Sequence, residues 1–339
     1  MIRREILPEN EPAFKANMHS HTTCSDGVLT PREAKELYKG NGYSILAYTD
    51  HHTYHNQTDM SDESFLAISG YELNFDLFDA NGGLTKTCHM NAIARDPDRV
   101  YPIEGRGLYS IDAINDAIKQ LRNNGFIVNL NHPSWSNQSP EDVVQLEGFT
   151  AIELYNSGCA RTYNIGESQL HYDAYLKAGK KSLMVFADDN HASCRAFSPY
   201  YSGGYHAGYE MPSRGVVTRV ASMDSCLACV WIYSRELSYR PIMDSLMSGR
   251  YYCSTGPSIS KYYVEDDTIH LACSPARAVF LKTKAWGISS SLMDPNGSIT
   301  NAEFDLGRLR ENSEEFFRIE IVDSNGDMAF TNPYYLSEL

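Results

Sequence analysis

Apolar, strand-like runs alternate with helical patterns from the start of the chain to about residue 250, and this alternation most constrains the fold. It is typical of parallel strands that are joined by crossover helices. The runs predict strands at 14–19, 43–48, 65–71, 90–94, 126–130, 151–155, 183–187 and 215–221. We therefore expect an α/β domain built around parallel strands.

Two of the helices have clear boundary signals. Thr30 is a candidate N-cap, Pro31 suits the first turn, and Glu33 lies three residues after Thr30, as in a capping box. Residues 110–124 place apolar side chains at helical spacing and are followed by Gly125, a common helix stop. These patterns predict one helix after the first strand and another before the strand at 126–130.

The pattern changes beyond about residue 257. Short strand-like runs follow at 269–273, 279–283, 302–306 and 317–322 without long helices between them. Residues 323–327 are typical of a turn between two strands. We therefore expect two domains, one over residues 1–256 and a small all-β domain over residues 257–339.

Composition and charge argue against several classes of protein. No apolar run approaches the roughly 18 residues that a membrane span requires, and the N-terminal residues do not resemble a secretory signal. The formal net charge of -14 argues against a nucleic-acid-binding surface, with short oligonucleotides left open. The 8 cysteines are scattered, and reduced thiols in the cytoplasm explain them most simply. The sequence does not indicate an oligomeric state.

Side chains of the types that bind metals follow or border the predicted strands. Side chains two apart on a strand point the same way, so His19 and His21 present two imidazoles to one point. The carboxyl ends of strands in an α/β barrel converge on one face and carry the active site. The further residues in comparable positions are Asp26, His51, Glu72, His89, His132, Asp189 and His191.

Each of these residues has an ordinary explanation when it is taken alone. His132 before Pro133 fits a hydrogen-bonded turn residue, Glu72 fits a surface acid, and Asp188 or Asp189 fits a helix cap. Together they would form a costly buried polar cluster unless cations compensate it. The sequence therefore predicts a metal site, and mixed imidazole and carboxylate ligands favour Zn, Mn or Fe over Ca.

The order of these elements resembles the PHP superfamily, named for polymerase and histidinol phosphatase. The resemblance covers residues 14–255, and a likeness to the carbaryl-hydrolase-like branch lies in residues 172–180 and 249–257. It implies a distorted seven-stranded (β/α) barrel that holds up to three metals, followed by a small C-terminal all-β domain. The motifs that carry it are His19-Ser20-His21, Ser25-Asp26-Gly27, Thr30-Pro31 with Glu33, Thr49-Asp50-His51, Gly70-Tyr71-Glu72, His89, Asn131-His132-Pro133 and Asp189-Asn190-His191.

The resemblance implies two or three divalent ions with Glu72 as a bridging ligand. The choice between Asp188 and Asp189 is open, and we favour Asp189 because its spacing to His191 repeats the offset of the first motif. The implied ligand sets are His19, His21, Glu72 and Asp189 for the first ion, Asp26, His51 and His191 for the second, and Glu72, His89 and His132 for the third.

The leading functional hypothesis is hydrolysis of a small phosphoester by a metal-bound hydroxide. His191 or Asp26 would manage protons, and Arg161 and Arg195 are candidates to bind phosphate oxygens. Either arginine is equally well explained as a surface cation.

Two other hypotheses stay open. The same hydroxide can attack a carbamate, ester or amide, or the protein can be a non-catalytic ligand-binding protein. Glu153 with Asn156 either orients a ligand or packs at a strand end.

Overall fold

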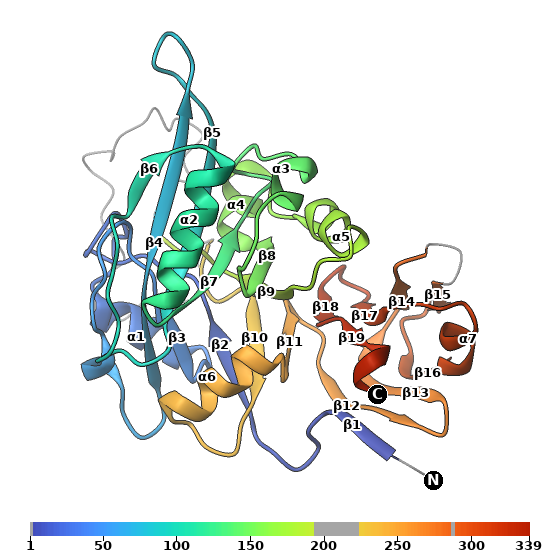
Figure 1. Cartoon of the computed structure of the whole chain (residues 1–339). Coiled ribbons are helices and arrows are strands. Elements are labelled where there is room, and N and C mark those ends of the chain that lie inside the picture. The colour runs from blue at the N-terminus through green and yellow to red at the C-terminus, as the bar shows by residue number, and fades with distance from the viewer. Residues whose placement is uncertain (1–2, 193–223, 286–288) are drawn as a thin grey trace.

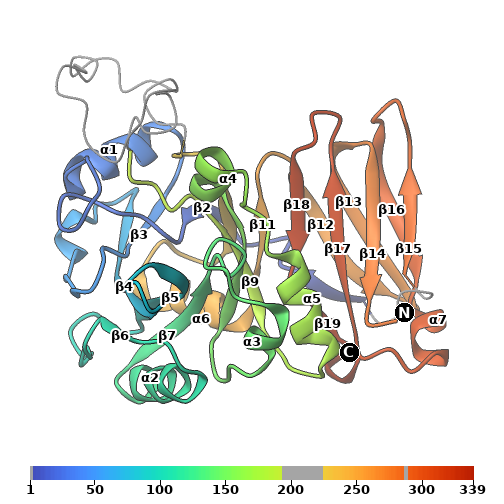
Figure 2. The ribbon, with the colours of Figure 1, turned by 90° about the horizontal axis from the view of Figure 1, so that it is seen from above.

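One large sheet contains most of the strands of the chain. A smaller sheet of four strands lies beside its C-terminal strands (Figures 1 and 2). The structure is a computed structural model that describes residues 3–192, 224–285 and 289–339. The predicted strand at 215–221 lies outside the described residues. Among the helices of the described part, none is both long enough and apolar enough to cross a membrane.

The large sheet follows a path of consecutive neighbours. The path is β15 (Ser290–Met293), β14 (Ala278–Thr283), β17 (Phe316–Val322), β18 (Met328–Thr331), β11 (Tyr251–Ser254), β10 (Cys229–Tyr233), β2 (Ala13–Asn17), β3 (Ile45–Tyr48), β4 (Leu66–Phe78), β5 (Leu84–Ala94), β7 (Phe126–Asn131), β8 (Ala151–Asn156) and β9 (Leu183–Ala187). Two further strands lie off it, β6 (Arg106–Leu108) beside β4 and β19 (Tyr334–Tyr335) beside β17.

The helices of the first 256 residues lie against this sheet (Figure 1), and α1 and α2 begin where the sequence predicts. Thr30 and Glu33 form a reciprocal capping box at the start of α1, and Ser110 caps α2 through the backbone N–H of Ala113. The helices are α1 (Pro31–Gly40), α2 (Ile111–Asn123), α3 (Pro140–Val144), α4 (Ser157–Tyr163), α5 (Gln169–Lys177) and α6 (Tyr239–Ser248).

The expectation of parallel strands is correct for only part of this sheet. β2, β3 and β4 are parallel, as are β7, β8 and β9, but β5 is antiparallel to both β4 and β7. β4 does not end near Tyr71 but continues to Phe78, and the Asp79 side chain accepts hydrogen bonds from the backbone of Asn81 and Gly83. The result is a long hairpin that projects beyond the neighbouring strands (Figure 1). Glu72 therefore lies within a strand rather than after one.

The described strands do not form a closed barrel. The path ends at β9, and no ladder joins β9 to β2 in the described part of the chain. The residues just after these two strands meet in one isolated bridge between Ser20 and Asn190. The backbone N–H of His21 donates to Asn190 (2.9 Å), and that of Asp189 donates to His19 (3.0 Å). The observed architecture is thus a mixed α/β sheet in which the segment after β9, the last strand of the path, meets the segment after β2, a strand inside the path, beside these residues.

The C-terminal residues form strands as expected, together with one short helix, α7 (Leu306–Glu311). The four-stranded sheet has the order β1 (Arg3–Leu7), β12 (Ile259–Glu265), β13 (Thr268–Ala276) and β16 (Ile299–Asp305). Its apolar face packs on β14 and β17, where Phe317, Ile319 and Ile321 are buried. The first strand of the chain thus belongs to this smaller sheet.

Candidate metal centre

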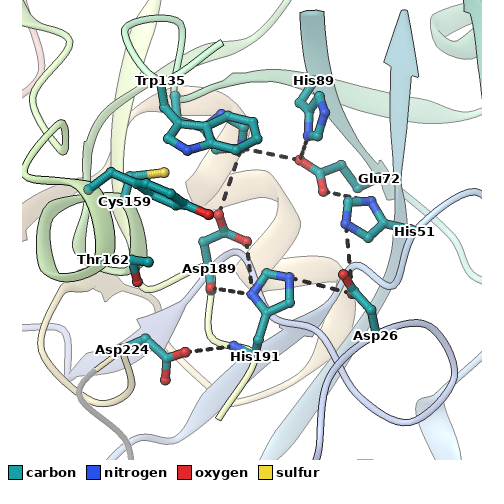
Figure 3. A pocket seen from close by; sticks show the side chains of 13 residues that line it. Asp26, His51, Glu72, His89, Trp135, Cys159, Thr162, Asp189, His191 and Asp224 are labelled. Atoms are coloured by element: carbon teal, nitrogen blue, oxygen red, sulfur yellow. Dashed lines mark hydrogen bonds and ion pairs between the residues drawn. The ribbon is translucent and has the colours of Figure 1, made fainter. Parts of the chain in front are cut away.

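All nine residues predicted as metal ligands lie together in one cluster. Seven of them line a common pocket (Figure 3). His19 and His21 follow β2, His51 follows β3, and Asp189 and His191 follow β9. Glu72 and His89 come from the hairpin of β4 and β5, His132 follows β7, and Asp26 comes from the loop before α1.

His19, His21 and Asp189 form the buried floor of the cluster. The Nε2 atoms of His19 and His21 lie 3.1 Å apart. Asp189 Oδ1 lies 3.1 Å from the first and 3.0 Å from the second. Both imidazoles are fully buried. The two-residue offset of the first motif therefore directs both rings to one carboxylate, as the strand period requires.

Glu72 stands at the centre, with its side chain only 1% exposed. Its carboxylate touches five imidazoles, which is the arrangement that a bridging ligand needs. Oε1 lies 3.1 Å from His89 Nδ1, 3.4 Å from His19 Nε2 and 3.5 Å from His132 Nε2, and Oε2 lies 3.0 Å from His51 Nδ1 and 3.4 Å from His21 Nε2.

Asp26 covers the open side of the cluster. Its side chain is 50% exposed, and Oδ1 lies 3.4 Å from His191 Nε2 and 3.8 Å from His51 Nε2. The same oxygen lies 3.7 Å from His21 Nδ1. This group contacts both solvent and the buried imidazoles.

The spacing of these donor atoms fits bound divalent ions. Bonds of about 2.0–2.2 Å place two ligands of one tetrahedral or octahedral ion roughly 2.8–3.6 Å apart, and most of the distances above lie in this range. His51 Nδ1 is buried without a hydrogen-bond partner, although Glu72 Oε2 is 3.0 Å away. An ion between these two atoms would explain a close approach that has no hydrogen-bond geometry, and it would add His51 to Glu72 and His89 as a ligand of that ion.

At Glu72 and His51, the electrostatics favour the protonation states that metal ligation requires. Burial raises the pKa of Glu72, but the charges of His89, His19 and His51 outweigh it and hold the pKa well below its usual range. Burial lowers the pKa of His51 to about 3. Metal ligation needs ionised carboxylates and neutral imidazoles, and the shifts of Glu72 and His51 supply these states. For His19 and His132, burial lowers the pKa, but the neighbouring carboxylates outweigh burial and raise it.

His191 behaves differently from His51. Burial lowers its pKa, but the hydrogen bond with Asp26 and the charge of Asp189 outweigh burial and raise the pKa to about 9. Its Nδ1 lies 3.0 Å from the backbone oxygen of Asp189. The side chain of His191 is 25% exposed, whereas that of His132 is 2% exposed, so His191 can hold a proton where solvent reaches the pocket.

Two of these residues have left-handed backbone conformations. The φ angle is 51° at Asp189 and 26° at His132. Non-glycine residues pay for such conformations, and they persist where the surrounding structure fixes them, commonly at functional sites.

Glu153 and Asn156 hold the ligands in place through hydrogen bonds. Glu153 is buried, and its Oε1 lies 2.9 Å from His19 Nδ1. Oε2 accepts from the His132 backbone N–H and from Asn156 Nδ2, each at 2.9 Å. Asn156 Nδ2 also donates to Asp189 Oδ2 (3.1 Å). These contacts support an orienting role for Glu153 and Asn156. The contact between Glu153 and His19 Nδ1 also fixes the tautomer of His19.

Asp188 is separate from the cluster. Its carboxylate accepts hydrogen bonds from the hydroxyls of Tyr38 (2.8 Å) and Ser157 (2.6 Å). The backbone N–H groups of residues 226, 227 and 228 also donate to it. Burial raises the pKa of Asp188 to about 6, although these donors lower it. The structure therefore brings Asp189, and not Asp188, to the histidines.

The pocket over the cluster has a volume of about 210 Å³. The remaining residues of the pocket wall are not among those predicted from the sequence. Trp135 follows the His132 motif in the same loop. An aromatic residue so close to a predicted ligand is the sequence signal that could have identified it as part of the pocket wall. Asp224 accepts a hydrogen bond from the His191 backbone (3.0 Å), and no sequence motif indicates it. The other added residues are Gly158, Cys159, Thr162 and Tyr163.

The two predicted phosphate-binding arginines do not join this wall in the described residues. Arg161 lies on α4, is exposed, and is not among the residues that line the pocket. Arg195 lies outside the described residues.

Comparisons with known proteins give weak similarities only. No family model and no curated protein matches the chain. A two-domain protein from Bacteroides vulgatus containing a predicted PHP-like metal-dependent phosphoesterase is 15% identical, with 98% of each chain covered and a TM-score of 0.47.

Two further solved structures match about half of the chain. A protein from Bifidobacterium adolescentis described as a metal-dependent phosphoesterase is 14% identical over 57% of this chain and 92% of its own, with a TM-score of 0.38. An amidohydrolase from Chromobacterium violaceum, with bound sulfate and no metal, is 14% identical over 51% of this chain and 86% of its own, with a TM-score of 0.35. The residue roles below therefore rest on the contacts of this chain alone.

Proposed function

We propose that the cluster binds two or three divalent ions of Zn, Mn or Fe and that the protein hydrolyses a small phosphoester. The observation that carries the proposal is the convergence of nine imidazole and carboxylate side chains. Each of the nine side chains has a nitrogen or oxygen atom that could bind a metal within 3.5 Å of such an atom in another of the nine. Packing so many polar groups together is costly unless cations compensate them.

The ligand sets that we propose overlap at Glu72. His19, His21, Glu72 and Asp189 would hold the first ion, Asp26, His51 and His191 the second, and Glu72, His89 and His132 the third. When bound, such ions supply Lewis acidity and lower the pKa of water, which makes a nucleophile available at neutral pH.

The protein's own groups would then orient the ligands and move protons. Glu153 keeps the proton of His19 on Nδ1, so that Nε2 faces the cluster as an acceptor. His191 Nε2 lies 3.4 Å from Asp26 Oδ1, and Asp26 is half exposed. With the first and third ions bound, this pair can pass a proton between the pocket and solvent, whereas the second ion would occupy the same atoms. We assign proton transfer to these two side chains.

Charge favours a phosphoester as the substrate. Asp26, Glu72 and Asp189 bring three negative charges, whereas two divalent ions bring four positive charges and three bring six. Glu153 beside His19 and Asp224 beside His191 add two more carboxylates. The site loaded with three ions is therefore cationic and attracts an anion, even though the whole chain carries a net charge of -14. The pocket volume of about 210 Å³ suits a small molecule.

One observation favours a second candidate, a carbamate, ester or amide hydrolase. Among the described residues that line the pocket, none is an arginine or a lysine. Phosphate sites commonly use arginine for paired hydrogen bonds, and a less charged ester needs no such partner.

Metal analysis of the purified protein, followed by a substrate panel, tests the proposal. The panel contains nitrophenyl phosphate, bis-nitrophenyl phosphate, nitrophenyl acetate and a nitrophenyl carbamate, each assayed with Mn and with Zn. Turnover of a phosphate ester that is lost in Glu72→Gln supports the proposal, and turnover of the acetate or carbamate alone supports the second candidate. Bound metal without any turnover would indicate a ligand-binding protein, and absence of metal binding would refute all metal-dependent roles.

We also propose the division of the chain into residues 1–256 and 257–339. Separate groups of buried apolar side chains support it. The exceptions are Ile6, Leu7, Tyr233 and Tyr252, which pack with the C-terminal group, and Phe316 and Phe330, which pack with a group of the first part. Limited proteolysis near residue 256 tests this division.

A further inference from the structure

A second polar cavity lies between α5 and the face of β14 and β17 that is turned toward α5. It shares no lining residue with the pocket over the metal ligands. Its charged lining residues are Asp173 and Lys177 from α5, Lys282 from β14, Lys284 just after β14, and Arg318 from β17. Cations therefore outnumber anions in the lining by four to one.

Arg318 is buried in this cavity wall with an incomplete set of partners. Its side chain is 1% exposed, and Nη2 donates to Asp173 Oδ1 (2.6 Å) and forms an ion pair with Glu320 Oε1 (2.8 Å). Nη1 is buried without any hydrogen-bond partner. The rings of Tyr172 and Phe330 lie 5.4 and 6.0 Å from the guanidinium carbon, but aromatic rings do not replace an oxygen acceptor. Buried donors nearly always have an acceptor, so this atom indicates a missing one.

Lys282 adds a second charge on the same face. It lies directly opposite Arg318 in the antiparallel pairing of β14 and β17, and like charges in such a pair destabilise a sheet. The Lys282 charge acts on Glu320, which already forms an ion pair with Arg318. Among the described residues, neither Lys177 nor Lys282 forms an ion pair, whereas Lys284 pairs with Glu315 (2.5 Å).

We propose that this cavity, which we call the α5 pocket, binds a small oxyanion such as phosphate or a carboxylate. Arg318 Nη1 would donate to it from the wall, and Lys177 and Lys282 would approach from opposite sides. The space of about 40 Å³, measured for the centres of water molecules, holds about three waters at roughly 10–15 Å³ each. That size fits one phosphate or carboxylate group and excludes a large ligand.

The position of the α5 pocket gives the anion a structural consequence. Lys177 belongs to a helix of the first 256 residues, whereas Lys282 and Arg318 belong to the C-terminal strands. One bound oxyanion therefore neutralises cations from both parts of the chain and joins them.

Calorimetric titration of the metal-loaded full-length protein tests the proposal, with inorganic phosphate in one arm and acetate in the other. We expect the double variant Lys177→Gln/Lys282→Gln to lose a binding event of the wild type, with Kd raised at least ten-fold for one or both anions. Phosphate that binds at the metal cluster is unaffected by these changes, so the difference between the two proteins reports the α5 pocket alone. Loss for phosphate only assigns the pocket to phosphates, and loss for acetate as well assigns it to oxyanions in general.

Two controls keep the result interpretable. Lys119→Gln/Lys261→Gln removes the same charge from exposed positions that do not line the α5 pocket, and it should retain both isotherms. The single variant Lys177→Gln changes only an exposed side chain on α5, so a partial loss is still measurable if the double variant unfolds. Identical isotherms for wild type and the Lys177 variants, for both anions, would overturn the proposal.

Discussion

Replacing Glu153 by glutamine should weaken metal binding while leaving the fold intact. The carboxylate accepts three contacts, one at Oε1 from His19 and two at Oε2 from the His132 backbone and Asn156, each at 2.9 Å. The amide of glutamine has the same shape but only one oxygen. When that oxygen takes the place of Oε2, it accepts from both the His132 backbone N–H and Asn156 Nδ2. The NH₂ group of the glutamine then faces His19 Nδ1.

This orientation changes the tautomer of His19. Nδ1 must accept a hydrogen bond from the new NH₂ group, so the ring proton moves to Nε2, the atom that faces His21 and Asp189. A protonated Nε2 cannot bind a metal. Loss of such orienting carboxylates typically costs about 10–100-fold in metal affinity, which equals roughly 1.4–2.7 kcal/mol.

Competition with a chromophoric chelator measures this affinity, and nitrogen NMR of labelled histidine reports the tautomer. Glu147→Gln, which changes an exposed acid, is the matched control and should behave as wild type. An unchanged metal affinity in a folded Glu153→Gln protein, or a His19 proton that stays on Nδ1, would refute the reasoning.

Three more perturbations follow from the same contacts. Removing the metals with a chelator should lower the unfolding temperature in calorimetry and readdition should restore it, because an ion present at 1,000 times its Kd stabilises the folded state by about 4 kcal/mol; an unchanged melting curve would contradict the metal site. Asp188→Asn should lower the free energy of unfolding in urea by about 2–4 kcal/mol, because its NH₂ group would face donors that now have a carboxylate oxygen; a loss below about 0.5 kcal/mol would be incompatible with this role. Gly27→Ala should cost about 1–3 kcal/mol by overpacking, because the new Cβ would lie 2.4 Å from the backbone of His21, whereas Gly40→Ala meets nothing within 4 Å and should fold as stably as wild type.

The sequence predicts the cluster well where local geometry decides it. His19 and His21 are two residues apart on one strand end, and the strand period alone directs them to the same side. Asp189 and His191 are also two residues apart, and the same argument predicts that their side chains lie on one side.

Glu72 belongs to the predicted group of ligands, but its local structure differs from the predicted strand end. Leu73, Phe75 and Leu77 alternate with polar residues, a strand pattern that continues past Glu72. The following Asp79-Ala80-Asn81-Gly82-Gly83 is typical of a turn between two strands. These signals predict the hairpin, and an interpretation based on βα alternation alone misses it.

Tertiary contacts determine the rest. Asp224 reaches the pocket 33 residues after His191, and no spacing rule connects them. The orphan donor of Arg318 depends on its packing between α5 and β17, so a charge count of the sequence cannot reveal it.

The bridge between Ser20 and Asn190 has a consequence for the order in which the protein matures. Ser20 lies between His19 and His21, and Asn190 lies between Asp189 and His191. The backbone hydrogen bonds that connect the segment after β2 with the segment after β9 therefore alternate with the metal-ligand residues. An ion held by His21 and Asp189 would span the same junction. Amide exchange at residues 19–21 and 189–191 should therefore slow sharply once metal is taken up, and a newly made chain would acquire its final architecture only after loading.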